Sequence, residues 1–567
     1  LNMLNVNDKK KSSIKRDKVL KYANQKLPEF PRNIAGIEDY SGDWNFEKAA
    51  HLLRRTTIGP TLEEINKSVE EGLNQTLEKL LDNSEKIFEP PINYDDDKDE
   101  ETQLGETWVN AEKNRESGAS VRKSSYAGWR VSLILDKKNP ISIRENMVLF
   151  WQNHFATEWA VVKESRYLYW MHEKFRNNFI GNFKDLVKKI NIDPQILEYL
   201  SGIYNVKEAP NENYARELLE LFTVGKGPID GDDSYTYYTE SDIVEASKVL
   251  TGWQVEKNFI GANRQYFTSD RHDNSTKTFS SKFGGKSISN NGDKEHEDLI
   301  NMIFENNRVS EYICEKIYRW FVYYVIDDEV KEKIIIPLSK TLRENNFEIK
   351  PVLSQLFKSS HFFEQHIQGA VIKGPIDFNF GILRQIPFTN YDDISYFNKY
   401  KFWWERHRES DALGQSILDS PNVAGWPAYY QNPLYHEYWI TSVTLPMRTK
   451  HISKYLSNNG VFRASEENDE LMIKSEPLEI LNSIDQPSDI ILIIETLCKW
   501  LFPLYSEISD SRKSDLINIV IGNNPNLWED EYNDYINTPD DEKKESLNKK
   551  LRSLLKEICL TPEYYLS

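Results

Sequence analysis

The sequence contains few cysteines and no long apolar run. Cys314, Cys498 and Cys559 are widely spaced, and each lies in an apolar stretch typical of a helix. We therefore expect three buried free thiols, because no Cys-x-x-Cys pair suggests a metal or redox site. No apolar run approaches the roughly 18 residues that a membrane-spanning helix needs. The sequence thus predicts neither a disulfide framework nor a transmembrane segment.

An excess of positive charge is also absent. The 567 residues include 71 Lys and Arg against 89 Asp and Glu, which gives a net charge of −18. General nucleic-acid binding is not expected, because such proteins neutralise phosphates with Lys and Arg. Hydrophobic residues make up 39% of the chain and aromatic residues 12%. This content excludes a disordered chain and suffices for a large core without disulfides.

Several common catalytic motifs are missing. The chain has no P-loop, no Gly-x-Gly-x-x-Gly, no Gly-x-Ser-x-Gly and no His-Glu-x-x-His, and its ten histidines are scattered. A site in this protein must therefore be assembled from residues that lie far apart in the sequence.

The distribution of apolar residues predicts a mainly α protein, a large helical assembly with irregular and short β-like insertions. We expect a basic flexible arm at 1–40, a helical core at 41–460 and a C-terminal helical region at 461–567 packed on that core. The insertions are expected at about 255–295 and 386–440, where Gly, Asn, Ser and aromatic residues replace the helical pattern.

Two Ser/Thr-x-x-Glu pairs predict capping boxes at helix starts, Thr61 with Glu64 and Ser142 with Glu145. In the second helix, His154 falls in the middle of the apolar side. Such a histidine is either a core residue whose ring nitrogens are hydrogen-bonded within the protein or a metal ligand or catalytic base.

The segment that follows Pro210 predicts an amphipathic helix, with Asn211 as N-cap and Gly225 after its end. Arg216, Glu217 and Glu220 lie on its polar face. One interpretation is a solvated face with ion pairs four residues apart. The other is a cleft wall on which the two glutamates bind a cation or divide acid and base roles.

A His-Asp pair, His272 and Asp273, lies in a polar loop shortly before Lys277. It is either a ligand or proton-transfer pair, or a turn in which the Asp side chain caps the backbone.

Acidic turns suggest a structural calcium ion more weakly. Asp95, Asp97 and Asp99 with Glu106 have the spacing of calcium ligands, but Glu100 stands where the loop needs glycine. Asp230–Asp233 is a second short acidic turn.

Seven segments, taken in order, resemble the bacterial family catalogued as domain of unknown function 1800. They span roughly residues 45–445 and are His51–Pro60, Phe150–Thr157, Asn211–Gly225, Thr251–Trp253, His272–Asp273 with Lys277–Phe279, Lys373–Pro375 and Pro421–Pro427. The stretch from Lys226 to Tyr237 departs from the family's pattern by a Gly/Asp-rich loop.

The resemblance implies a mostly helical, exported bacterial protein, located in the periplasm, at the cell surface or outside the cell, although no signal peptide is recognisable in this chain. It also implies a sulfatase-like partner family. It implies no reaction, ligand or catalytic residue set.

Three functions remain open. The first is a metal-assisted enzyme that acts on an extracellular polymer such as a polysaccharide. Its divalent metal ion would be bound by His154, His272 and Asp273, and its catalytic residues would be Glu217, Glu220, Arg216 and Lys373. The second is a non-catalytic surface or export-associated protein that binds a glycan or the sulfatase-like partner. The third is a redox enzyme with an iron or copper centre.

Overall fold

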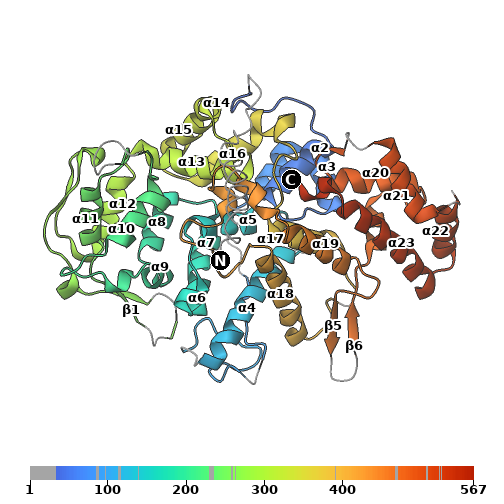
Figure 1. The fold of residues 1–567 in the computed structure, drawn as a ribbon, viewed down its shortest axis with the longest axis horizontal. Helices are drawn as coiled ribbons and strands as arrows, with labels where there is room; N and C mark the ends of the chain where they lie inside the picture. The colour runs from blue at the N-terminus through green and yellow to red at the C-terminus, as the bar shows by residue number, and fades with distance from the viewer. Residues whose placement is uncertain are drawn as a thin grey trace, which may run out of the picture.

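The protein consists almost entirely of helices, which confirms the mainly α class (Figure 1). In the described part of the chain, the strands form three separate two-stranded antiparallel pairs. The computed structural model describes residues 34–84, 88–95, 98–112, 116–137, 140–228, 235–256, 260–261, 264–389, 391–465, 470–505, 509–522, 524 and 526–567. The expected basic arm, 1–40, therefore lies mostly outside the described residues.

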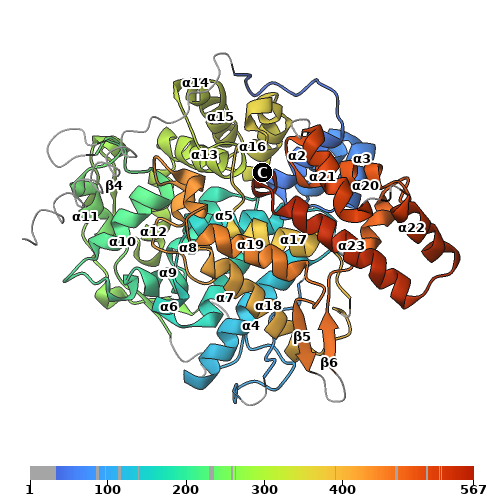
Figure 2. The ribbon, with the colours of Figure 1, turned by 45° about the vertical axis from the view of Figure 1, so that its right-hand side comes forward.

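The centre of the molecule is helix α5 (Arg144–His154), which is buried on nearly every side. Around it lie the helices α7 (Ser165–Asn177), α13 (Asn307–Phe321), α17 (Pro375–Gln385) and α19 (Thr444–Tyr455) (Figures 1 and 2). The side of α5 that carries Gln152 is covered as well, because Gln152 is buried and its Nε2 donates to Ile417 O at 2.8 Å. A helix that is covered all round belongs to the core of a large protein.

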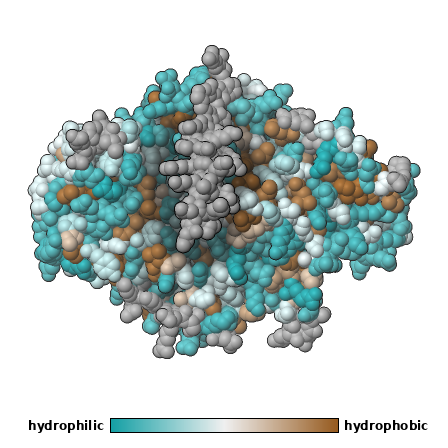
Figure 3. All heavy atoms as spheres, viewed as in Figure 1, coloured by the Kyte–Doolittle hydropathy of each residue, from teal (hydrophilic) through white to brown (hydrophobic). Residues whose placement is uncertain are grey.

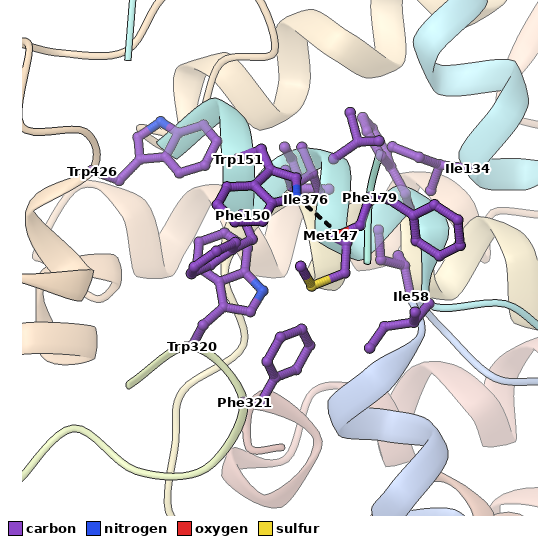
Figure 4. Packing of buried hydrophobic residues seen from close by; sticks show 14 of the residues in the cluster. Ile58, Ile134, Met147, Phe150, Trp151, Phe179, Trp320, Phe321, Ile376 and Trp426 are labelled. Carbon is purple, nitrogen blue, oxygen red and sulfur yellow. Dashed lines mark hydrogen bonds between the residues drawn. The ribbon is translucent and has the colours of Figure 1, made fainter. Parts of the chain in front are cut away.

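Aromatic and aliphatic side chains fill the space beside α5. In Figure 4, Met147 and Phe150 of this helix lie next to Trp320 and Phe321 from the end of α13, and all four are buried. The dashed line in the figure is the hydrogen bond from Trp151 Nε1 to Phe179 O, at 2.9 Å. This packing fixes the end of α13 against α5.

The first helix pair is α2 (Phe46–Thr56) and α3 (Leu62–Leu80). The capping box of Thr61 and Glu64 at the start of α3 is confirmed. Between the helices, Gly59 has φ +58°, and a Cβ there would lie 2.3 Å from Gly381 Cα in α17. The left-handed backbone and this close approach both require glycine. They bring the end of α2 directly against α17.

The predicted capping box at Ser142 is wrong. The N-cap of α5 is Ile143, which makes no side-chain cap, and Ser142 Oγ accepts from the N–H of Arg144 at 3.2 Å instead. The Glu145 side chain binds Arg176 and not the helix start, because Arg176 donates to its carboxylate through Nε and Nη2, each at 3.1 Å. A buried ion pair therefore replaces the local cap.

One edge of the molecule combines short helices with small hairpins, as expected for 255–295. Strand β1 (Trp253–Val255) pairs with β2 (Gln265–Phe267), with Trp253 opposite Phe267, and β3 (Lys277–Thr278) pairs with β4 (Ser287–Ile288). The surrounding helices are α8 (Phe183–Asn191), α9 (Pro194–Tyr199), α10 (Glu212–Glu217), α11 (Glu240–Val249) and α12 (Glu295–Ile303). Figure 1 shows this group on the left, and α8 contacts α5 through the stacked rings of Phe183 and Trp151.

The prediction of an irregular stretch at 386–440 is wrong in part. Helix α18 (Tyr396–Ala412) occupies 17 residues of it and packs along α4 (Glu116–Leu135). Its sequence mixes aromatic and charged residues around the whole helix, so it has little apolar periodicity to detect. After Ala412 the chain is irregular, with two short 3₁₀ helices, η9 (Pro427–Tyr429) and η10 (Tyr435–Trp439).

The C-terminal region is helical apart from the hairpin of β5 (Phe462–Ser465) and β6 (Glu470–Ile473). It contains α20 (Ile490–Leu501), α21 (Asp510–Ile521), α22 (Leu527–Asn537) and α23 (Asp541–Cys559). Trp500 at the end of α20 donates through Nε1 to Pro60 O at 2.9 Å, and α23 packs on α19. These contacts join the end of the chain to α2 and to the centre.

The remaining elements are short helices that cover the core. They are α6 (Trp159–Val162), α14 (Asp328–Val330), α15 (Ile336–Glu344), α16 (Ile349–Lys358), the π-helices η2 (Leu218–Thr223) and η6 (Lys331–Ile335), and the 3₁₀ helices η1 (Gly202–Tyr204), η3 (Ser269–Arg271), η4 (Ser281–Phe283), η5 (Gly292–Lys294), η7 (His361–Phe363), η8 (Gln365–Ile367), η11 (Pro477–Ser483) and η13 (Pro562–Tyr565).

Two predictions from composition can be compared with the structure. The three cysteines are buried and unbonded, as expected. Within the described ranges, no helix is both long and apolar enough to cross a membrane. On the face shown in Figure 3, hydrophilic residues predominate and hydrophobic residues form small separate groups.

Candidate functional site

Segments that are far apart in the sequence meet at a cavity in the centre of the molecule. The end of α2, the end of α13, the segment 371–377 and the helices η9 and η10 all contribute to its wall. Its volume is about 70 Å³, enough for a few water molecules or one compact group. We call it the cationic cavity, because its charged lining side chains are Arg54, Arg55, Arg319, Lys373 and Asp377.

Arg54 and Arg55 reach the cavity from the last turn of α2, and each also caps another helix. Arg54 Nη2 donates to the carbonyls of Lys499 and Trp500, at 2.9 and 2.7 Å, in the last turn of α20. Arg55 donates to Phe321 O from Nε at 2.9 Å, at the end of α13. A helix C-terminus carries only about half a negative charge, so these contacts orient the guanidinium groups without neutralising them.

Lys373 enters the cavity just before α17. Its backbone N–H donates to Tyr565 O at 2.8 Å, and Pro375 starts the helix two residues later. Gln415 Oε1 accepts from the N–H of Ile376 at 2.9 Å, which completes the helix start. In the described structure the Lys373 amine makes no hydrogen bond; Nζ lies 4.0 Å from the centre of the Tyr564 ring.

Positive charge at this site exceeds negative charge. The charge of Asp377, in the first turn of α17, acts on Arg54, Arg55, Lys373 and also on Arg448 of α19. None of these four cations forms an ion pair with a carboxylate elsewhere in the described chain. One acidic side chain, Asp377, therefore acts on four buried cations, of which Arg54, Arg55 and Lys373 line the cavity and Arg448 contacts the Lys373 carbonyl without lining it.

The pKa values reflect this crowding. Burial lowers the pKa of Arg54 and that of Arg55 to about 10, although Asp377 opposes both shifts. Burial, with Arg54 and Arg448 as neighbours, lowers the pKa of Lys373 to about 8. Burial raises the pKa of the Asp377 carboxyl, and the neighbouring cations oppose that shift. A further negative charge in the cavity would stabilise all of these cations.

Unused donors remain on one cation, Arg448, and on one neutral side chain, His436. Arg448 donates from Nη2 to Lys373 O at 2.8 Å, but its Nε and Nη1 are buried without a partner in the described chain. His436, which lines the cavity, accepts from the N–H of Ile372 through Nδ1 at 3.2 Å. This assigns the proton to Nε2, which is buried and unpartnered among the described residues. Unused buried donors are costly, and an acceptor in the cavity would satisfy one.

Aromatic side chains form the opposite wall. The rings of Trp320 and Tyr429 stack with their centres 4.1 Å apart, and Trp439 meets Tyr429 edge-on at 6.3 Å. Asn153 in α5 holds the preceding loop, because its Oδ1 accepts from the N–H of Trp426 at 2.7 Å. A Cβ at Gly425 would lie 2.3 Å from the same oxygen. The Asn-His-Phe segment of α5 therefore positions this wall.

His154 lies at the end of α5, and both its ring nitrogens are engaged by the protein. Nε2 donates to Phe222 O at 3.1 Å, and Nδ1 accepts from Lys316 Nζ at 3.2 Å. Lys316 also donates to Leu221 O at 3.1 Å, which, like Phe222 O, belongs to η2. Burial and the Lys316 charge hold the pKa of His154 well below its ordinary value. These contacts are those of a core histidine, and a metal-ligand role stays a prediction.

His272 belongs to a second buried group, which we call the Glu295 cluster and define as Glu295, His272, Lys277 and Thr251. Lys277 Nζ lies 2.6 Å from Glu295 Oε2, and His272 Nε2 lies 2.9 Å from Oε1. His272 Nδ1 lies 2.9 Å from Thr251 O. Burial would raise the pKa of Glu295, but the hydrogen bonds from His272 and Lys277 outweigh it and lower that pKa. Every charged group in this cluster has a partner.

Asp273 does not join that cluster through its carboxylate. Its Oδ1 accepts from the N–H and the hydroxyl of Ser275, at 2.8 and 2.5 Å. Its backbone carbonyl accepts from Lys277 Nζ, and its backbone N–H donates to Thr251 Oγ1. This is the Asx-type turn that was the alternative to a ligand role.

Arg216, Glu217 and Glu220 lie on α10 and η2, which the N-cap Asn211 begins as predicted. Arg216 makes a bidentate pair with Glu240, at 2.8 and 2.7 Å, and not the expected pairs within its own helix. Glu220 forms an ion pair with Lys226 and accepts a hydrogen bond from the Tyr238 hydroxyl. Burial and the charge of Glu220 raise the pKa of Glu217.

The acidic turns give no calcium site that can be described. Both carboxylate oxygens of Asp99 accept from Arg122, at 2.7 and 3.0 Å, and Asp97 and Asp230–Asp233 lie outside the described residues. Across the described ranges there is no group of three or more His, Cys, Asp or Glu side chains placed to hold a metal ion. The His154 ring bonds to Phe222 and Lys316, the His272 ring to Thr251 and Glu295, and the Asp273 carboxylate to Ser275. The divalent metal and the calcium ion stay predictions.

Of the residues predicted from sequence to form a site, the structure brings only Lys373 to the cationic cavity. Sequence reasoning missed Arg54, Arg55, Asp377 and His436. The available signal was the pair of consecutive arginines in α2, where all residues from 49 to 56 are buried. Two buried arginines in one turn need acceptors from elsewhere in the fold.

The fold and the cavity define a mainly helical protein with a buried, positively charged site at the junction of distant segments. A family model described as "Protein of unknown function (DUF1800)" matches residues 51–566, and the chain belongs to this family. The match continues past 445, where the sequence motifs ended, and includes the C-terminal helices. No curated protein and no solved structure shows significant similarity to the chain.

Proposed function

We propose that the protein binds an anionic group, such as a carboxylate, sulfate or phosphate, in the cationic cavity. The observation that carries the proposal is the charge balance of the cavity wall, where Arg54, Arg55, Arg319 and Lys373 accompany one acidic side chain, Asp377. Buried charges without partners are strongly unfavourable, so proteins rarely keep them unless a ligand supplies the missing charge.

The size of the cavity and its donors support a compact, oxygen-rich group. Guanidinium groups bind carboxylate, sulfate and phosphate oxygens through paired N–H donors. The unpartnered Nε2 of His436 adds a neutral donor on the same wall. A cavity of about 70 Å³ fits the charged group itself, with the rest of the ligand outside.

A larger ligand remains consistent with this chemistry. Acidic polysaccharides carry sulfate or carboxylate groups, so the cavity would suit the hypothetical extracellular polymer substrate. It would also suit the extracytoplasmic location that the family resemblance implies. A sulfatase-like partner and metal-assisted catalysis rest on the resemblance and on the sequence pattern, respectively, and stay predictions. The binding-protein alternative has the more direct support from the geometry.

Isothermal titration calorimetry with sodium sulfate, phosphate and acetate, at constant ionic strength, tests the proposal. We expect saturable binding of at least one anion by the unmodified protein. Arg55→Met should weaken it about 10- to 100-fold, because a hydrogen bond to a charged group contributes about 1.5–3 kcal/mol. Arg448→Met should weaken it to a lesser extent.

The matched control is Arg463→Met, which removes an exposed arginine of β5 whose side chain is 62% accessible. It should leave the affinity unchanged. Absence of saturable binding for all three anions, or an equal loss in the control, would contradict the proposal. Constant ionic strength is needed because surface charges bind anions weakly and are screened by salt.

A further inference from the structure

We infer that the amine of Lys373 forms a Schiff base with the carbonyl carbon of a small oxo acid whose carboxylate occupies the cationic cavity. The inference rests on the proposed anion binding and adds the class of compound and the atom that reacts with it. It comes from the position and surroundings of the Lys373 amine, which makes no hydrogen bond or ion pair in the described chain.

The backbone holds Lys373 firmly while its amine stays available. The N–H of Lys373 donates to Tyr565 O and its carbonyl accepts from Arg448, both at 2.8 Å. The side chain is 7% exposed and lies along the cavity wall, with Nζ against the Tyr564 ring. A structural lysine would be expected to pair with a carboxylate, as Lys277 does with Glu295 at 2.6 Å.

The surroundings raise the fraction of the neutral amine, which is the nucleophilic form, above that of an exposed lysine. Burial is the main cause, and Arg54 and Arg448 add like charge, so the pKa of Lys373 falls to about 8. Lysines that act as nucleophiles are commonly activated by burial and by a neighbouring cation. The titratable and charged groups that act on or contact this amine are Asp377, Arg54, Arg448, Cys559 and Tyr564.

The reaction needs only an amine, a carbonyl compound and a proton carrier. The lone pair of Lys373 Nζ attacks the carbonyl carbon, and the carbonyl oxygen takes up a proton to become a hydroxyl group. The nitrogen then releases a proton, a second proton joins the hydroxyl, and water leaves as the C=N bond forms. Asp377 lines the same cavity and its charge acts on Lys373, so we assign this carboxyl group to hold and return these protons.

The experiment is reductive trapping of the full-length protein. Pyruvate and sodium cyanoborohydride are added, and the adduct is located by peptide mass spectrometry. We expect one reduced pyruvate adduct, on Lys373, and at least tenfold less adduct with acetone, which lacks the carboxylate. Saturating sulfate should suppress the labelling. Labelling of Lys373 should increase with pH through about 8, whereas exposed lysines require a higher pH.

Lys373→Arg should abolish the adduct, while the matched control Lys450→Arg, which changes an exposed lysine of α19, should retain it. If sulfate binds in calorimetry but pyruvate labels exposed lysines as readily as Lys373, the Schiff base is contradicted and anion binding stands. If acetone labels Lys373 as well as pyruvate does, the carboxylate plays no part and the inference fails. Competition by sulfate on the unmodified protein keeps the test valid even if the variant folds poorly.

Discussion

The protein contains two buried groups of charged side chains that are built from its characteristic sequence segments, and they differ in how the charge is balanced. In the Glu295 cluster, the Glu295 carboxylate accepts from both Lys277 and His272. The other ring nitrogen of His272, Nδ1, lies 2.9 Å from Thr251 O. At the cationic cavity, Arg54, Arg55, Lys373 and the neighbouring Arg448 share Asp377, and donors of Arg448 and His436 remain unused in the described chain.

This difference indicates different roles. A cluster whose charges and hydrogen bonds are complete holds segments together, because removing any member leaves a buried partner unsatisfied. A cluster that is incomplete in the protein alone is costly to keep, and a ligand of the opposite charge explains why it is kept. Buried histidine and acidic residues therefore do not by themselves mark a functional site. The completeness of their contacts is more informative.

The largest expected effect is in the complete cluster. Glu295→Ala leaves the Lys277 ammonium buried without its counter-charge, so the free energy of unfolding should fall by about 3–5 kcal/mol. Urea denaturation measures this change. The matched control is Glu297→Ala on the same helix, whose ion pairs are exposed and should contribute less than about 1 kcal/mol. Equal effects of the two changes would show that the cluster is not structural.

In the cavity, we expect a substitution to raise the free energy of unfolding. Lys373→Met should stabilise the protein at pH 7, by up to about 3 kcal/mol, because the fold lowers the pKa of this lysine from 10.5 to about 8. Between these two pH values the folded state binds fewer protons than the unfolded state. The stability of the unmodified protein relative to the variant should therefore rise across this window. Denaturation curves at pH 7, 9 and 10.5 test it, and a constant difference would contradict it.

A smaller effect is expected when the carboxylate of the cavity is neutralised. Asp377→Asn removes the acidic side chain from the described lining of the cavity, so sulfate affinity at pH 8 should increase about 5- to 10-fold. The sign of the change in affinity is the informative part, because Asp377→Asn should raise the affinity and Arg55→Met should lower it. Calorimetry with sulfate measures both. A loss of affinity in Asp377→Asn would mean that Asp377 positions the cations more than it competes with the anion.

The smallest effect is expected outside both clusters. Arg216→Gln breaks the half-exposed pair with Glu240 and should change the free energy of unfolding by less than about 1 kcal/mol. It should leave sulfate binding unaltered. A strong loss of binding would revive the prediction that the polar face of α10 lines a site.

Local features were predictable from the sequence, whereas the site was not. The capping box of Thr61 and the N-cap Asn211 involve residues close in sequence, and both are present. The box at Ser142 fails because Arg176, more than 30 residues away, takes the Glu145 carboxylate. The aromatic and charged sequence of α18 hides a helix that packing on α4 stabilises.

The cationic cavity depends on contacts that no local pattern records. Lys373 was predicted as a site residue, but its grouping with Arg54 requires the close approach of Gly59 to Gly381, from two distant segments. His154 and His272 attract attention in the sequence because histidine is versatile. Their hydrogen bonds, which decide between core and ligand roles, come from η2 and from α12.

The most direct test of anion recognition is anomalous diffraction from crystals grown or soaked with sodium selenate. Selenate has the shape and charge of sulfate, and its selenium atom is located without reference to a model of the protein. We expect a selenium peak in the cationic cavity, within hydrogen-bonding reach of Arg55 or His436, and its loss in Arg55→Met. Selenate bound only at the surface, with the cavity empty at a saturating concentration, would contradict the central claim.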